Sequence, residues 1–266
     1  MIVAVDTGGT KTLLALFTKE GEVLKTFKFA TPSNQDFYVN ELVSHIKTLV
    51  GEETIDCISA ALPDVTEGDV VERFANLPWK NFNAKQELMA HFKDIPIIVG
   101  NDANLGGLGE VHSLAKLPHR ALYVTISTGI GTGFLHSGHI SHTLMATEGG
   151  HIMLEYDGVL REWEKFASGK AIFETYGMFG KDITSKKTWT QIADRISRGF
   201  LALIPILKPD VIIIGGSMGT HFEKYRIPLE ELLDEHLPFV ARRPAIVAAK
   251  RPEEAVIYGC YYNAIR

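Results

Sequence analysis

The sequence has few cysteines, no excess of basic residues and no long apolar segment. Its only two cysteines, Cys57 and Cys260, lie in apolar segments, so we expect two buried reduced thiols instead of a disulfide. The net charge is −5, which predicts no nucleic-acid partner, because nucleic-acid-binding surfaces cluster Lys and Arg. No apolar run approaches the roughly 18 residues that span a bilayer, and no signal peptide precedes the first predicted strand. We therefore expect a cytoplasmic protein without a membrane partner.

Two segments share a pattern in which a strand, a glycine-rich turn and a returning strand follow one another. The first runs from Ile2 to Phe17 around the turn DTGGTK, and the second from Ala121 to Leu135 around TGIGTG. Backbone N–H groups in such turns cradle phosphate oxygens, and a turn carboxylate such as Asp6 suits Mg²⁺ held through water. Neither spacing is that of a Walker loop or a dinucleotide fingerprint. Either turn alone is an ordinary hairpin, but the two together predict phosphate binding.

The segment from Ile95 to Glu110 predicts a buried strand that delivers polar side chains to the start of a helix. Asn101 and Asp102 follow the apolar run, and a glycine-rich helix is expected from Ala103 towards Ala115, packed closely on a neighbour. Ligands of open α/β sheets bind at this edge, and the helix dipole favours an ionised carboxylate there. Asp102 is therefore a candidate base for a substrate hydroxyl. A helix N-cap is the alternative interpretation.

The remaining pattern alternates strands and helices, which predicts an α/β protein. The expected strands are 23–29, 55–62, 211–214 and 245–248, and the expected helices are 36–50, 85–92, 159–166, 189–207, 229–237 and 253–266. The irregular stretch 64–83 is interpreted as a binding loop or as a surface excursion with Trp79 in the core. Glycines after the strand at 211–214 predict space for a nucleoside or close strand–helix packing.

Five motifs in this order resemble those of the ROK family of bacterial sugar kinases, within the superfamily of actin-like ATPase folds. They are DTGGTKT at 6–12, ANLPW at 75–79, NDAN at 101–104, STGIGTG at 127–133 and PDVIIIGGSMG at 209–219. The resemblance covers nearly the whole chain. It implies two RNase H-like domains with a cleft between them, residues 1–117 with 253–266, and residues 118–252.

The resemblance also implies a function, the ATP- and Mg²⁺-dependent transfer of the γ-phosphoryl group to a hexose hydroxyl, most readily that of glucose. Asp102 would be the general base. The sugar-binding set would be Asn76, Asn101, Asp102, Glu148, His151 and Glu164, the last through the match of EKFASG to E-x-x-x-S-G. The nucleotide set would be Asp6, Thr7, Gly8, Gly9, Thr10, Lys11, Thr128, Gly129, Gly131, Gly215, Gly216 and Ser217.

One departure from the family concerns zinc. Family members commonly carry C-x-C-G-x-x-G-C after the G-H motif, whose histidine and cysteines bind a structural zinc ion. The segment between His151 and Glu164 contains no cysteine. We therefore predict that this protein binds no zinc, which leaves the orientation of His151, and with it the sugar preference, open.

Several alternatives stay open from the sequence. The acceptor could be N-acetylhexosamine, mannose or fructose, and polyphosphate could replace ATP. A sugar-responsive repressor, also found in the family, would need a DNA-binding segment before the first strand, where Met1 stands. A non-catalytic, chaperone-like ATPase would not need the polar set around Asp102. A homodimer is compatible with the resemblance.

Overall fold

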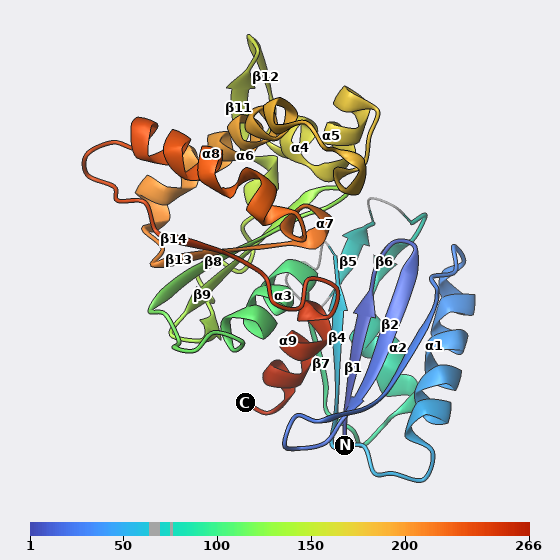
Figure 1. The fold of residues 1–266 in the computed structure, drawn as a ribbon. Helices are drawn as coiled ribbons and strands as arrows, with labels where there is room; N and C mark the ends of the chain where they lie inside the picture. Colours follow the sequence, from blue (N-terminus) through green and yellow to red (C-terminus); the bar gives the residue numbers. More distant parts are fainter. Residues whose placement is uncertain (64–69, 75–76) are drawn as a thin grey trace. The chain divides into compact units, whose positions relative to one another are not determined.

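The computed structural model describes residues 1–63, 70–74 and 77–266, which divide into two compact units (Figure 1). Unit 1 comprises Met1–Gly109 and Glu254–Arg266, and unit 2 comprises Glu110–Glu253. Within the described ranges, the strands form two five-stranded sheets, one in each unit, and two small two-stranded sheets. The predicted α/β class is confirmed. Of the helices in these ranges, none has the length and apolar character that a membrane span requires.

The sheet of unit 1 has the strand order β3-β2-β1-β4-β7. Strands β1 (Ile2–Thr7), β2 (Lys11–Phe17) and β3 (Val23–Ala30) form an antiparallel meander. Strands β4 (Cys57–Leu62) and β7 (Ile97–Asn101) then run parallel to β1. Every residue of β4 is buried, as expected for a parallel strand covered on both faces.

Helices cover both faces of this sheet. Helix α1 (Gln35–Val50) begins where the Asn34 side chain accepts a hydrogen bond from the N–H of Phe37, and its apolar stripe packs in one cluster with Leu16 of β2. Phe17 points to the opposite face and stacks on Tyr261 of helix α9 (Ala255–Ala264), with ring centroids 5.1 Å apart. Helix α2 (Ala84–His91) precedes β7.

Helix α3 (Asp102–Val111) follows β7 and packs backbone to backbone on α9. A Cβ atom added to Gly259 would lie 1.8 Å from the carbonyl oxygen of Leu105, and one added to Gly109 would lie 2.1 Å from that of Ala255. This contact confirms the predicted close packing for Gly109 of α3. The helix ends at Val111, four residues before the predicted end.

Glu110, in the last turn of α3, is a buried carboxylate that holds the chain on its return from unit 2. Its two carboxylate oxygens accept hydrogen bonds from the backbone N–H groups of Lys250 and Arg251, each at 2.7 Å. The residue is only 1% exposed. The charge is thus compensated by directed backbone donors, as a buried carboxylate requires.

The sheet of unit 2 repeats the arrangement, in the order β10-β9-β8-β13-β14. Its strands are β8 (Arg120–Ile126), β9 (Ile130–His136), β10 (His139–Ile140), β13 (Val211–Gly215) and β14 (Ala245–Ala248). The first three are antiparallel, and the last two are parallel to β8. Each unit therefore has a meander followed by parallel strands, the RNase H-like arrangement that the resemblance implied.

The helices of unit 2 pack around a separate core. Helix α6 (Lys186–Leu207) buries Ile192, Ile196 and Phe200 against the sheet, and α8 (Phe222–His236) packs beside it. Helix α8 begins seven residues before its predicted start. The shorter elements are η1 (Gly149–His151), α4 (Glu164–Ala167), α5 (Gly169–Tyr176), η2 (Gly180–Asp182) and α7 (Gly216–Gly219).

The helix predicted over 159–166 is wrong at 159–162 and confirmed at 164–166. Strand β12 (Val159–Glu162) pairs with β11 (Met153–Tyr156), and helix α4 starts only at Glu164. Asp157 and Gly158 join the strands with φ of 53° and 73°. An Asp-Gly pair with both φ angles positive is a favoured two-residue hairpin turn, which overrides the weak helical spacing.

The stretch predicted to be irregular, 64–83, contains a small antiparallel sheet of β5 (Val71–Arg73) and β6 (Lys80–Phe82). Trp79 is 2% exposed, and its ring nitrogen donates a hydrogen bond to the carbonyl oxygen of Ser33. Trp79 is therefore part of the core, as the second interpretation proposed. Residues 64–69 and 75–76 lie outside the described residues.

Candidate active site

The first glycine turn joins β1 to β2 and is supported from the end of β3. The N–H of Gly8 donates to the carbonyl oxygen of Lys11 at 3.0 Å, and the Thr31 hydroxyl donates to the carbonyl oxygen of Gly8 at 2.8 Å. Thr10 and Lys11 are exposed at the tip, next to Gly9. The Thr7 hydroxyl is buried, 2.6 Å from the Tyr38 hydroxyl. This hydrogen bond attaches the start of the turn to helix α1.

Asp6 and Asp102 place two interacting carboxyl groups in unit 1, near the edge where the parallel strands end. Burial, and next the negative charge of Asp102, raise the pKa of Asp6 to about 7, while Lys28 opposes the shift. Carboxylates that repel each other in partly buried surroundings favour a bound cation. This arrangement fits a divalent ion such as Mg²⁺.

Asn101, rather than Asp102, makes the capping contact of α3. The Asn101 Oδ1 atom accepts a hydrogen bond from the N–H of Asn104 at 3.1 Å, whereas Asp102 Oδ1 accepts from the N–H of Ala103 at 2.7 Å. Both side chains are half-buried. One N–H group at the start of the helix, that of Ala103, thus donates to the Asp102 carboxylate, which favours the ionised form.

The second glycine turn joins β8 to β9 and contacts Glu164. Glu164 Oε2 accepts a hydrogen bond from the N–H of Ile130 at 3.3 Å, and a Cβ atom added to Gly129 would lie 2.6 Å from the same oxygen. The next segment packs on this turn too, because a Cβ atom on Gly150 would lie 1.9 Å from the carbonyl oxygen of Ile130. Within the turn, Thr128 is exposed and Gly131 is half-buried, and Glu148, which precedes Gly149 and Gly150, is also exposed.

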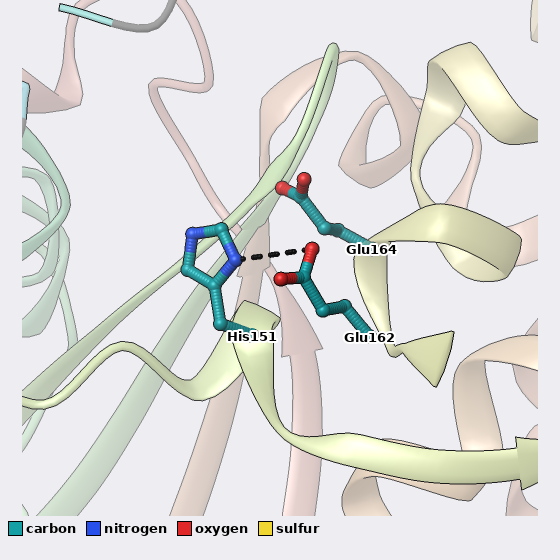
Figure 2. A group of neighbouring side chains, drawn as sticks. All are labelled: His151, Glu162 and Glu164. Carbon is teal, nitrogen blue, oxygen red and sulfur yellow. Dashed lines mark ion pairs between the residues drawn. The ribbon is translucent and has the colours of Figure 1, made fainter. Parts of the chain in front are cut away.

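His151 lies beside two carboxylates in unit 2, as Figure 2 shows. His151 Nδ1 is 3.4 Å from Glu162 Oε2, and the ligand atoms of His151, Glu162 and Glu164 all lie within 4.8 Å of one another. Lys165 Nζ lies 2.7 Å from Glu164 Oε1 and 3.4 Å from Glu162 Oε2. Hydrogen bonding to His151, followed by weaker effects of Lys165, lowers the pKa of Glu162. Sequence reasoning missed Glu162 and Lys165.

A cavity of about 670 Å³ opens beside the second turn, within unit 2. Ser127, Thr128 and Ser217 line it. Phe173 and Phe179 line it with stacked rings, whose centroids are 4.4 Å apart. Lysines Lys170 and Lys181 also border it. The cavity therefore combines an aromatic wall, which suits a planar base, with cationic and hydroxyl groups, which suit phosphate.

The glycines after β13 serve packing as well. A Cβ atom on Gly215 would lie 2.3 Å from the Tyr123 hydroxyl oxygen, and one on Gly216, which has a φ of 72°, would lie 2.6 Å from the carbonyl oxygen of Ile126. Both of these glycines are thus required for close packing. Ser217 and Met218 are the members of this motif that line the cavity.

The predicted site residues are distributed over both units. Unit 1 carries the first turn, Asn101 and Asp102, and unit 2 carries the second turn, Glu148, His151, Glu164 and the motif at 215–217. Asn76 lies outside the described residues. The structure adds Phe173 and Phe179 to the nucleotide candidates. The sequence showed only that both residues are apolar, because the segment between them carries no motif typical of a ligand site.

Comparison with known proteins assigns the chain to a family. The ROK family profile matches residues 2–266. A glucokinase from Streptomyces coelicolor is 31% identical, with 97% of this chain and 96% of the relative aligned. A fructokinase from Lactococcus lactis is 26% identical over 81% of this chain and 78% of its own length. The crystal structure of a ROK family glucokinase from Streptomyces griseus in complex with glucose and AMPPNP has a TM-score of 0.83, with 21% identity and 98% of both chains covered. The family profile and the Streptomyces coelicolor glucokinase match nearly the whole length, and the chain therefore belongs to the ROK family.

Proposed function

We propose that this ROK-family sugar kinase transfers the γ-phosphoryl group of ATP to a hexose, with the 6-hydroxyl of glucose as the preferred acceptor. The observation that carries the proposal is the position of Asp102, at the junction of a parallel strand and a helix, with Asn101 making the cap contact. The similarity to the Streptomyces coelicolor glucokinase supports glucose as the acceptor.

In this mechanism Asp102 takes the proton of the acceptor hydroxyl as its oxygen attacks the γ-phosphorus atom and ADP leaves. Phosphoryl transfer depends mainly on positioning and charge stabilisation, so one carboxylate suffices as base. Such a base contributes about 10²- to 10⁴-fold to the rate. Asn101, Glu148, His151 and Glu164 bind other hydroxyl groups of the sugar, and Asn76 is a further candidate from the motif match.

Two regions serve the nucleotide. The first turn, from Asp6 to Lys11, and the second, with Thr128, Gly129 and Gly131, offer backbone N–H groups to the phosphates. The base and ribose occupy the cavity beside Ser217, where Phe173 and Phe179 provide a stacking surface. Asp6 would hold Mg²⁺ through water, and the bound ion would neutralise charge on the phosphates.

A coupled ADP-release assay over a panel of sugars tests the proposal. Glucose, mannose, fructose, N-acetylglucosamine and N-acetylmannosamine are each supplied with ATP and Mg²⁺, and glucose is then repeated with polyphosphate as donor. We expect the highest kcat/KM for glucose with ATP. A higher value for another sugar would replace glucose as the acceptor. ATP hydrolysis that no sugar stimulates would overturn the kinase assignment in favour of a sugar-independent ATPase.

A further inference from the structure

We propose that Glu162 is a positioning residue for His151, and that Glu162 and Lys165 together perform the orienting role that a metal ion serves in zinc-binding relatives. The proposal rests on the proposed function only in taking His151 to bind a sugar hydroxyl. Glu162 lies on a different element from His151, at the end of hairpin strand β12. Neither Glu162 nor Lys165 belongs to the site that the family motifs define.

The ring of His151 and the carboxylate of Glu162 form an ion-pair contact through one ring nitrogen. Nδ1 of His151 faces Glu162 Oε2 at 3.4 Å, on the side of the ring drawn with a dashed line in Figure 2. A carboxylate at Nδ1 favours a proton on that nitrogen, because the carboxylate only accepts hydrogen bonds. Nε2 is then the ring atom that remains for a substrate hydroxyl. Partners of this kind fix the ring orientation and tautomer of metal-bound histidines in the same way.

Lys165 contributes the positive charge that keeps this arrangement together. Its ammonium group contacts both Glu162 and Glu164, which raise its pKa and keep it charged. Two carboxylates without this ammonium would repel each other across a short gap. The same Glu164 accepts the N–H of Ile130, so the ion-paired group is attached to the second glycine turn.

The residues around His151 do not fit the family's zinc ion. Both cysteines of the chain belong to unit 1, in β4 and α9, so neither belongs to the unit that carries His151. Among the residues that the structure describes, the grouped candidate donors are one imidazole nitrogen and two carboxylates, and Lys165 is already paired with both carboxylates. A divalent cation bound there would have to displace the ammonium group. The ion-pair cluster thus takes the place of a metal centre.

Kinetics of three variants test the positioning role. Glu162→Ala removes the partner of Nδ1, Glu162→Gln keeps an acceptor oxygen but no charge, and Glu155→Ala removes an exposed carboxylate from the same hairpin as a matched control. We expect Glu162→Ala to raise the KM for glucose about 10- to 100-fold, with kcat and the KM for ATP changed less than threefold. Glu162→Gln should restore part of the affinity, and Glu155→Ala should match wild type. A KM for glucose within twofold of wild type in Glu162→Ala would overturn the proposal.

A second measurement does not depend on catalysis. Nitrogen-15 NMR of the histidine rings reports which ring nitrogen carries the proton, and a His151→Gln variant assigns the His151 signals. We expect His151 of sugar-free wild type to be protonated at Nδ1 and to change its tautomer distribution in Glu162→Ala. Identical His151 spectra in the two proteins would reject the role of Glu162, even if no sugar were phosphorylated.

Metal analysis completes the test. We expect the purified protein to contain less than about 0.1 equivalent of zinc, and to keep its His151 spectrum after dialysis against a chelator. One zinc per chain, together with a His151 spectrum that changes on chelation and returns with added zinc, would show that a metal orients the ring and would overturn the proposal.

Discussion

The carboxyl group of Asp6 interacts electrostatically with the negative charge of Asp102. This charge acts together with burial to raise the pKa of Asp6 to about 7. Near neutral pH, therefore, the folded protein does not hold both groups fully ionised unless a cation compensates them. Between about pH 4 and pH 8, the combined charge of the two residues thus depends on whether a cation is bound beside them.

The first prediction concerns pH and stability. The folded pKa of Asp6 is above its usual value, so the folded state keeps a proton that the unfolded state has lost, and stability from this group falls as the pH rises from about 4 to about 7. In metal-free buffer, the free energy of unfolding of Asp6→Asn should therefore rise relative to that of wild type as the pH increases over this range. The expected change is on the order of 2 kcal/mol, allowing for partial solvent screening. Urea unfolding at pH 4.5 and pH 8 measures the difference. A difference between the two proteins that stays constant with pH would contradict it.

The second prediction concerns the base. Asp102→Asn keeps the volume of the side chain but cannot take a proton, so kcat should fall about 10²- to 10⁴-fold with the KM for glucose changed less than fivefold. Steady-state assays with ATP and glucose measure both values, and circular dichroism checks the fold. Turnover within tenfold of wild type would remove Asp102 as the base.

The third prediction concerns the nucleotide cavity. Phe179 stacks on Phe173 and lines the cavity, so Phe179→Ala should raise the KM for ATP about tenfold, in line with the free energy of base–aromatic stacking. The KM for glucose should stay within twofold. Phe239→Ala serves as the control, because Phe239 is 99% exposed and does not line this cavity. Equal effects of the two variants on the KM for ATP would argue against stacking on Phe179.

The fourth prediction concerns Glu110. Glu110→Ala leaves the N–H groups of Lys250 and Arg251 without their acceptors, so the free energy of unfolding should fall by about 3 kcal/mol. Glu110→Gln, which retains one acceptor oxygen, should lose less. Chemical denaturation measures both variants against Glu52→Ala, the substitution of an exposed glutamate. A loss below about 1 kcal/mol in Glu110→Ala would show that water replaces the carboxylate.

Much of the fold was predictable because local patterns agree with the tertiary structure. The strand predicted over 245–248 is β14, and the helix over 36–50 is α1 with one added residue. The prediction failed at 159–162, where apolar spacing favours a helix but the Asp157-Gly158 turn forms a hairpin. There, two residues with positive φ place the segment Val159–Glu162 in a hairpin strand.

The candidate site was only partly predictable, for a physical reason. Asp102 and the glycine turns belong to short contiguous motifs, whose local geometry the sequence determines. The proposed roles of three other residues depend on partners that tertiary packing brings close. Glu162 contacts His151, Lys165 contacts Glu164, and Phe179 stacks on Phe173. No spacing in the sequence reports such contacts. Likewise, the cap of α3 was assigned to Asp102 as an alternative, but Asn101 makes the contact.

The close packing of α9 on α3 has a consequence for synthesis on the ribosome. Unit 2 is one continuous segment, whereas unit 1 needs residues 254–266, which are translated after unit 2. Until then the Gly109 and Leu105 surface of α3 has no helix against it, and Phe17 lacks the ring of Tyr261. Unit 2 is thus complete in the nascent chain before unit 1, and strands β1 and β2 lack helix α9 until unit 2 has been synthesised.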